Sequence, residues 1–404
     1  MVQTSPKVLS LTPLDKALSL IKESLSSYVA RTKTIQVEDS IGYVAAEDVF
    51  SSVDIPPYPK AAVDGVAARS GRLGGASLSN PVRLRLVRNP IHELQEGEAV
   101  FVSTGDGIPS GANVVVKIEN VRLVDDDYAE VVVAVPEGKN IIPEGYEIKV
   151  GDKLVEKGRR IKPEDTALLM EAEVDEVLVY ERPKIGLIPV GDDIYLEFMK
   201  SGIKGANYSF LAAKKINEFG GDVVLIDPSP DDVDTLSEKI FKASKTCDAI
   251  FTVGGCSIGR NDIVHRTVAG MSGARILFHG LKYNPAKPSG YALIGSTPLL
   301  MLPGHVVSMV GALHLLGKPL INHLQGLAYD DEKPIIAKVA ADQKLKPGMG
   351  NMVLVRLERR DKDYLAWPLS WGTNSIKNLV IADGFVLVDE GDLKAGQQVD
   401  VFPL

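Results

Sequence analysis

Three apolar runs separated by stretches of helical periodicity constrain the fold of this chain more than any other feature. They lie at residues 184–190, 222–226 and 248–253, and the stretches between them carry apolar residues three or four positions apart. Strands that are apolar on both faces and alternate with helices form a parallel sheet, which helices cover on both sides. The sequence therefore predicts a parallel α/β domain.

The segments around this domain show a different pattern. Prolines and glycines recur through residues 49–140 with alternating apolar positions between them, and the tail of the chain repeats this texture of short strands and turns. Near the start, Thr12 suits an N-cap, and Leu14 and Leu18 begin an apolar stripe, which predicts a helix there. We predict a multidomain α/β plus β chain with these parts: residues 1–48 and 141–181 (a mixed α/β linker domain), 49–140 (an inserted β domain), 182–328 (the α/β domain) and 329–404 (a small C-terminal β-barrel).

Charge and composition exclude several classes of protein. The formal net charge is -8 and no run of five Lys or Arg occurs, so nucleic-acid binding is not expected. The only cysteines, Cys247 and Cys256, lack the spacing of a zinc or iron–sulfur site. Two isolated thiols, and an N-terminus without a basic patch followed by an apolar run, predict a cytoplasmic protein. Pro303 and Gly304 interrupt the most apolar stretch, residues 299–316, so no membrane span is expected.

A candidate binding site lies where the predicted parallel strands end. Ligands of open parallel sheets bind at the carboxyl ends of the strands, and three loops there stand out. They cover residues 191–193, 254–262 and 303–305, and the last two open predicted helices. Backbone N–H groups and the positive end of the helix dipole attract anions at helix starts, and glycines let the backbone approach a ligand closely. We therefore predict an anion cradle formed by Gly254, Gly255, Ser257, Gly259, Pro303, Gly304 and His305.

Acidic side chains at the same edge suit a cation rather than a phosphate group. Mg²⁺ takes carboxylate ligands and bridges to phosphate oxygens. Lys287, in a turn fixed by Pro285 and Pro288, is placed to reach the same edge. Each residue also has an ordinary structural explanation, because Asp caps helices and Lys is commonly solvated. The candidate Mg²⁺ ligands are Asp193, Asp231 or Asp232, and Asp262.

Together these motifs resemble the MoeA/gephyrin E-domain family of molybdenum cofactor biosynthesis, and the resemblance runs over nearly the whole chain. Residues 63–67 are similar to the family's MDGYA, and residues 103–112 to its TGAxxPxGA. The GGxSxGxxD element is present intact at residues 254–262. Residues 284–288 and 302–305 resemble the family's KPGKP and LPGNP in altered form.

The resemblance implies an elongated homodimer in which the first part of the chain serves dimerisation. It implies a transferase that inserts molybdate into adenylylated molybdopterin with Mg²⁺ and releases AMP, and a molybdopterin-adenylylating partner. It also places the active site between the α/β domain of one subunit and the β domain of the other. On this basis Thr104 and Pro288 join the cofactor-binding residues, the metal ligands are Asp193, Asp231 and Asp262, and the catalytic residues are Asp64, Glu147, Asp193, Asp262 and Lys287.

The chain departs from the family pattern at the predicted site and not across its cores. Asp193 stands where the family has glutamate, Glu147 where it has aspartate, and Asn284 where KPGKP has its first lysine. Losing a lysine opposite a multiply charged ligand weakens anion binding, and Lys282 or His305 are candidates to compensate. The sequence leaves two functions open. One is insertion of molybdate or tungstate, and the other is an altered homologue that binds pterin or nucleotide, or scaffolds a partner, without metal transfer.

Overall fold

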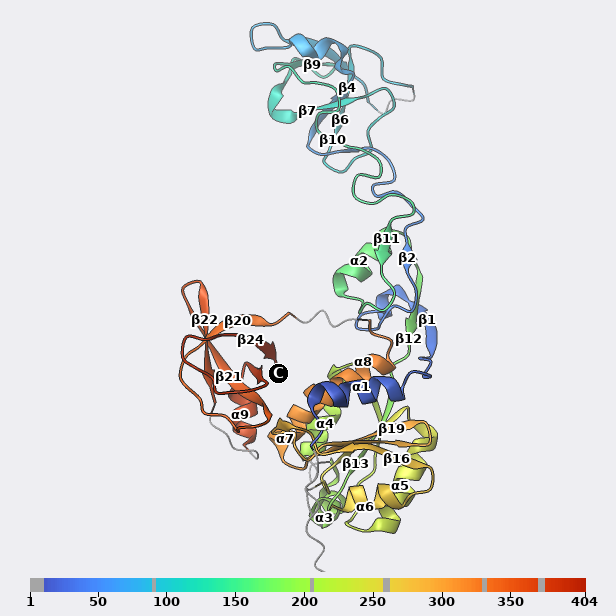
Figure 1. Cartoon of the computed structure of the whole chain (residues 1–404). Helices are drawn as coiled ribbons and strands as arrows, with labels where there is room; N and C mark the ends of the chain where they lie inside the picture. The colour runs from blue at the N-terminus through green and yellow to red at the C-terminus, as the bar shows by residue number, and fades with distance from the viewer. Residues whose placement is uncertain (1–10, 89–91, 204–206, 257–261, 329–332, 370–374) are drawn as a thin grey trace, which may run out of the picture.

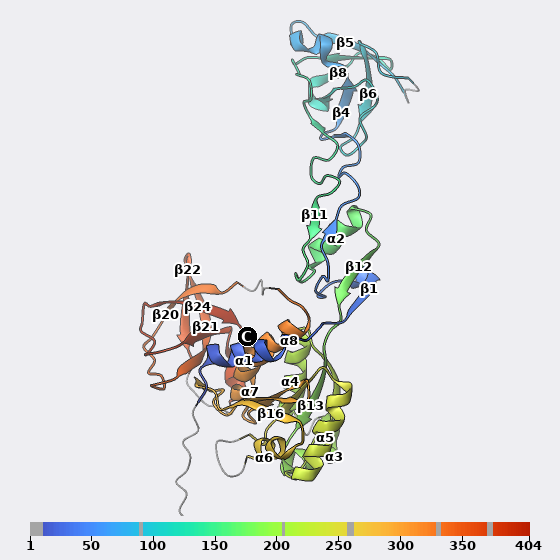
Figure 2. The ribbon, with the colours of Figure 1, turned by 45° about the vertical axis from the view of Figure 1, so that its right-hand side comes forward.

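The strands of the chain build separate sheets that follow one another along an elongated molecule (Figure 1). A computed structural model describes residues 11–88, 92–203, 207–256, 262–328, 333–369 and 375–404. The inserted β domain lies at one end and the α/β domain at the other, with the C-terminal barrel beside the α/β domain (Figures 1 and 2). The predicted α/β plus β fold class is confirmed, whereas the exact limits of its parts stay a prediction.

The α/β domain is built on a mixed six-stranded sheet. Its first four strands are parallel, and β18 runs antiparallel to both of its neighbours. The central strand β15 is buried along its whole length, as expected for a strand covered on both faces. The order across the sheet is β14 (Asp222–Ile226), β13 (Lys184–Pro189), β15 (Ala249–Val253), β19 (Thr297–Leu302), β18 (Gly290–Ile294) and β16 (Ala274–His279).

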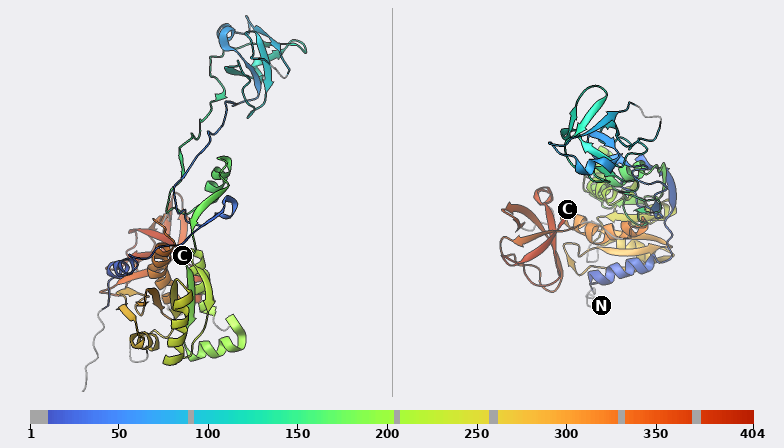
Figure 3. Two further views of the ribbon diagram at one scale, coloured as in Figure 1. Left: turned by 90° about the vertical axis from the view of Figure 1, so that its right-hand side faces the viewer. Right: turned by 90° about the horizontal axis from the view of Figure 1, so that it is seen from above.

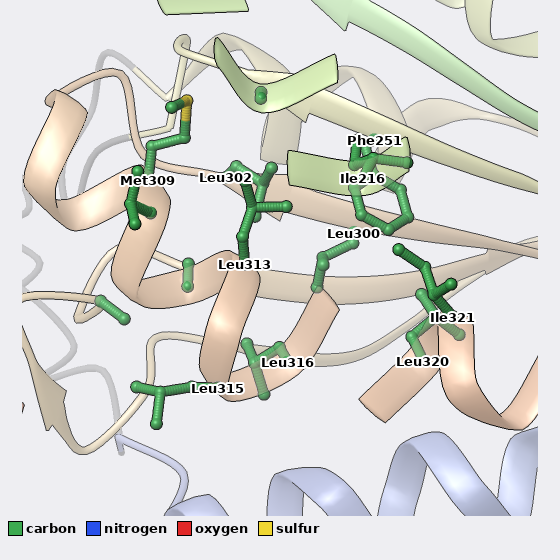
Figure 4. Close-up of a cluster of buried hydrophobic side chains, with 14 of the residues drawn as sticks. Ile216, Phe251, Leu300, Leu302, Met309, Leu313, Leu315, Leu316, Leu320 and Ile321 are labelled. Atoms are coloured by element: carbon green, nitrogen blue, oxygen red, sulfur yellow. The ribbon is translucent and has the colours of Figure 1, made fainter. Parts of the chain in front are cut away.

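Helices cover both faces of this sheet. One apolar cluster joins it to α1 (Leu14–Ser24), α4 (Asn207–Glu218), α7 (Val306–Ala312), a π-helix (Leu313–Gly317) and α8 (Lys318–Leu324). Figure 4 shows part of this cluster around Phe251, Leu300 and Leu313. A second cluster on the other face contains residues of α5 (Val233–Thr246) and α6 (Ile263–Gly270). Each fully buried Leu, Ile or Phe side chain contributes about 1.5–3 kcal/mol, so these clusters hold the strand ends in fixed positions.

The predicted N-terminal helix is present, but its predicted cap is wrong. α1 starts at Leu14 after Pro13 and has no side-chain cap. Thr12 instead lies beside the loop that follows β16, where its N–H donates to Gly280 O (2.9 Å) and its O accepts from Lys282 N (2.7 Å). Backbone pairing of this kind keeps Thr12 extended and joins the N-terminal segment to the loop after β16.

A narrow connection leads from the α/β domain to the β domain (Figure 3). It consists of two-stranded pairs and α2 (Pro163–Glu171). The pairs are β1 (Thr32–Gln36) with β12 (Glu176–Tyr180), β2 (Val49–Phe50) with β11 (Lys153–Val155), and β3 (Lys60–Ala61) with β10 (Ile141–Ile142). The β domain is a six-stranded sheet in the order β7 (Val114–Lys117), β4 (Gly65–Ala68), β6 (Glu98–Val102), β5 (Val82–Leu86), β9 (Tyr128–Val131) and β8 (Val121–Leu123).

The C-terminal part is a closed barrel, as predicted. The long strand β21 (Gly350–Arg360) pairs with strands on both sides, which closes the sheet on itself. Outside the barrel, β17 (Tyr283–Asn284) of the α/β domain adds to β21 in parallel and fastens the two parts together. The other elements are β22 (Asp363–Pro368), β20 (Ile335–Val339), β24 (Gln398–Pro403), β23 (Gly384–Val388) and α9 (Ile376–Ile381).

Candidate functional site

The carboxyl ends of the parallel strands bring the predicted loops to one edge of the sheet. β13 leads into α3 (Asp192–Ser201), β15 leads towards α6, and β19 leads into α7. Because these strands are parallel, their following loops gather at the same edge. The loop 191–193 also opens a helix, so three helices start here rather than the two expected from the sequence. The loop 280–289 returns from β16 to β18 at this edge as well.

Gly254 and Gly255, in the loop after β15, lie too close to neighbouring residues to carry a side chain. The Gly254 N–H donates to Leu302 O at 3.1 Å, and a Cβ on Gly254 (φ +88°) would lie 2.6 Å from Val190 O. A Cβ on Gly304 would in turn lie 3.3 Å from the Cα of Gly254. Gly255 (φ +63°) is equally enclosed. Glycine is therefore required here by both conformation and space, while the predicted residues Ser257 and Gly259 lie outside the described residues.

The carboxylates of the loops after β13 and β14 accept hydrogen bonds from backbone N–H groups. Asp192 Oδ1 accepts from Asp231 N (2.9 Å), and Asp231 Oδ2 accepts from Asp192 N (3.4 Å), so the loops after β13 and β14 bind each other reciprocally. Asp232 caps α5, and the Thr235 hydroxyl and N–H lower the pKa of its carboxyl. Asp193 is exposed in the first turn of α3. Among the predicted acidic residues of these loops, Asp231 and Asp232 therefore have structural roles.

Asp262 is the buried acidic residue of the edge. It is 5% exposed and caps α6, with Oδ1 accepting from His265 N at 2.8 Å. Its Oδ2 lies 2.7 Å from His279 Nε2, and the His265 and His279 rings lie against each other with centroids 4.3 Å apart. Neither histidine is predicted from the sequence as a site residue. The spacing of His265 from Asp262 suits a capping contact, but no pattern in the sequence indicates that His279 meets Asp262.

Lys287 lies in a loop that is held on two sides. Its carbonyl accepts from Leu281 N (2.9 Å), and its side chain is half-buried with no polar partner among the described residues. Asn284, which stands where the resembling family has a lysine, donates to Asn351 Oδ1 of the barrel at 3.3 Å. Lys282 lines a cavity of about 480 Å³ between the start of α1 and the barrel. His305 is exposed and precedes α7, and within the described residues no hydrogen bond joins Lys282 or His305 to Lys287.

The donors at this edge fit Mg²⁺ in one particular mode. Within the part of the chain that the structure describes, no three His, Cys, Asp or Glu side chains gather into a metal-binding group. Mg²⁺ is commonly held by one or two carboxylates together with phosphate oxygens and water. Asp262 and the exposed Asp193 are carboxylates of the kind that this mode uses, whereas the described residues form no all-protein cage.

Asp64 and Thr104 are brought together, but in the β domain. Thr104 donates to Asp64 Oδ1 from its backbone N–H (2.7 Å) and its hydroxyl (3.0 Å). Both lie near β4 and β6, at the far end of the molecule from the sheet edge (Figure 1). Glu147 is exposed in the narrow connection, where its N–H donates to Ile55 O (2.9 Å). Within one chain, the structure does not join these three residues to the α/β loops.

The contact between Asp64 and Thr104 predicts a measurable pKa change. The Thr104 N–H and then its hydroxyl lower the pKa of Asp64, so the contact stabilises the fold above the unfolded-state pKa and is lost as pH falls through the folded-state pKa. We expect Thr104→Val to raise the Asp64 pKa part of the way, because the N–H remains. Carboxyl-carbon NMR titration measures this shift, with Thr235→Val as a control that acts on Asp232. An unchanged Asp64 pKa in Thr104→Val would contradict the assignment.

The fold and the edge define a multidomain protein whose α/β domain gathers a glycine loop, helix starts and a lysine at one edge of its sheet. The chain belongs to the MoeA family of molybdopterin biosynthesis proteins. Residues 12–172 match the MoeA N-terminal region (domain I and II), residues 186–323 a probable molybdopterin binding domain, and residues 337–404 the MoeA C-terminal region (domain IV).

Relatives extend over the same length. A putative molybdopterin biosynthesis protein of Methanocaldococcus jannaschii is 28% identical, with 98% of each chain covered. The molybdopterin molybdenumtransferase of Haemophilus influenzae is 24% identical over 96% of this chain and 98% of its own. A crystal structure of the MoeA protein of Pyrococcus horikoshii OT3 is 26% identical with a TM-score of 0.83, and covers 98% of this chain and 100% of its own. In the described residues, no helix is long and apolar enough to cross a membrane.

Proposed function

We propose that this protein inserts molybdate or tungstate into adenylylated molybdopterin, with Mg²⁺, and releases AMP. The observation that carries the proposal is the glycine loop after β15, whose two positive-φ glycines lie between the neighbouring strand ends and lead to the capped start of α6. Such a loop suits a phosphate-bearing ligand. The molybdenumtransferase names of the relatives support the reaction.

The chemistry of the edge favours electrostatic stabilisation over a covalent nucleophile. Backbone N–H groups and the Lys287 ammonium offer fixed positive charge to the phosphates and the oxyanion. Burial raises the pKa of the Cys256 thiol well above its usual value, which keeps that thiol neutral and unreactive. Asp262 and Asp193 are the residues that would hold Mg²⁺, and bound Mg²⁺ supplies stabilisation of negative charge on phosphate oxygens.

The proposal includes a homodimer in the cytoplasm that receives its pterin from an adenylylating partner. Asp64, Thr104 and Glu147 lie away from the α/β edge of their own chain, so a second subunit is the source of these residues for each site. Sizing in solution tests this part of the proposal. A dimer is expected, and a monomer at assay concentration would remove the shared site.

An assay with purified full-length protein tests the reaction. Adenylylated molybdopterin, molybdate and Mg²⁺ are mixed with the protein, and AMP is measured over time. We expect AMP release that Asp262→Ala abolishes. Tight ligand binding without AMP release would contradict insertion.

That contrary result would support the altered homologue that binds pterin or nucleotide. One observation favours this second candidate. Asn284 stands where the family motif has a lysine, and its neutral amide already donates a hydrogen bond to Asn351. The Asn284→Lys variant separates the two functions. A large gain in AMP release over an inactive wild type would assign the loss of activity to this position.

A further inference from the structure

His279 is an unexplained buried polar residue at the candidate site. It ends β16, its side chain is 7% exposed, and neither ring nitrogen has a hydrogen-bond partner among the described residues. Buried nitrogen and oxygen atoms without partners are rare, and each one in a native fold calls for an explanation. Asp262 Oδ2 lies 2.7 Å from Nε2 of this ring.

The two contacts on Asp262 have different origins. The Oδ1 contact comes from α6 itself, because the N–H of His265 completes an ordinary helix cap at 2.8 Å. The Oδ2 contact comes from a separate strand, β16, and so ties the end of the glycine loop to the far side of the sheet. The cap acts on Oδ1 alone, whereas the contact from β16 restrains Oδ2 and with it rotation of the carboxylate about the Cβ–Cγ bond.

The surroundings fix the imidazole in turn. The His265 ring lies against it at 4.3 Å, and His279 pairs with Gly290 on β18, where any side chain would meet the ring, because a Cβ would lie 3.1 Å from Cδ2. The short contact to Asp262 lies outside hydrogen-bond angles. Hydrogen bonds at functional sites are often poorly aligned without ligand and tighten when it binds.

We propose that His279 is a positioning residue that orients the Asp262 carboxylate towards the ligand held by the glycine loop. The His279 ring, with Nε2 2.7 Å from Oδ2, restrains that oxygen while the α6 cap holds Oδ1, so the plane of the carboxylate keeps a fixed direction. Groups that hold a ligating carboxylate commonly change metal affinity 10- to 100-fold when they are removed. The inference rests on the proposed function only for its effect on Mg²⁺.

The test uses full-length wild type and the variants His279→Ala and His279→Gln, with His323→Ala on α8 as a control of the same residue type. Glutamine keeps an N–H donor at about the reach of Nε2. In His279→Ala we expect the half-saturating Mg²⁺ concentration for AMP release to rise about 10- to 100-fold with a smaller change in the maximal rate. His279→Gln restores most of the affinity, and His323→Ala equals wild type.

A second measurement needs no reaction. In ligand-free protein, we expect the His265 amide to exchange with solvent roughly two- to tenfold faster in His279→Ala, because its acceptor is less fixed. His279→Gln restores the slow exchange. If the exchange and the Mg²⁺ requirement of His279→Ala both stay within twofold of wild type, the inference is wrong. If wild type releases no AMP, the proposed function fails, and the exchange of the His265 amide still decides the role of His279.

Discussion

Replacing Lys287 by alanine is expected to lower the rate of AMP release about 100- to 1,000-fold, the usual effect of removing one fixed group that stabilises charge in a transition state. The side chain is half-buried at the sheet edge and has no polar partner among the described residues. Its ammonium is therefore available to a ligand. The loss should be large because Asn284, three positions before Lys287 in the same turn, carries no charge that could replace it.

The control for this variant is Lys344→Ala, an exposed lysine on the barrel side of the molecule. It removes the same charge from the chain and should leave the rate within twofold of wild type. Lys287→Arg keeps the charge but not its position, so it should recover part of the activity. Equal rates for Lys287→Ala and Lys344→Ala would place Lys287 outside the site.

Replacing Gly255 by alanine is expected to reduce the free energy of unfolding by about 1–3 kcal/mol, the usual cost of forcing extra atoms into a packed site. A Cβ there would lie 2.7 Å from Val190 Cγ1, 2.8 Å from Ile263 Cγ2 and 2.9 Å from Val264 Cγ2. The backbone also has a φ of +63°, which L side chains rarely adopt. Urea unfolding measures the loss, and ligand affinity should fall with it because the loop must move.

Gly273→Ala is the matched control for this substitution. Gly273 lies in the same domain with a φ of +76°, and a Cβ there would meet nothing within 4 Å. It therefore reports the conformational cost alone, and the difference between the two variants reports the packing of the glycine loop. A Gly255→Ala variant that is no less stable than Gly273→Ala would show that the loop is not packed as described.

Most of the architecture can be predicted from the sequence because local patterns determine it. The apolar run that ends at Val253 is a buried parallel strand, and the glycines after it have the positive φ angles that explain their identity. The strand direction then brings the turn before α7 to the same edge. Periodicity and glycine chemistry are sufficient for these conclusions.

Contacts between distant side chains could not be predicted in the same way. Asp262 and His279 are separated by α6 and most of β16, and their meeting depends on how that helix packs on the sheet. Thr12 was misassigned for a related reason, since a cap motif reports local preference while strand pairing with the 280–282 loop is a tertiary interaction. Asp231 is a predicted metal ligand, and the contact of its Oδ2 with the Asp192 N–H is one that no sequence pattern indicates.

The most direct test of the central claim measures the metal together with the nucleotide. Full-length protein is incubated with adenylylated molybdopterin, molybdate and Mg²⁺, and both released AMP and pterin-bound molybdenum are quantified over one turnover. The proposed function predicts that the two appear at the same rate, in equal amounts, and only when molybdate is present. AMP released without capture of molybdenum, or a pterin that stays bound and adenylylated, would contradict it.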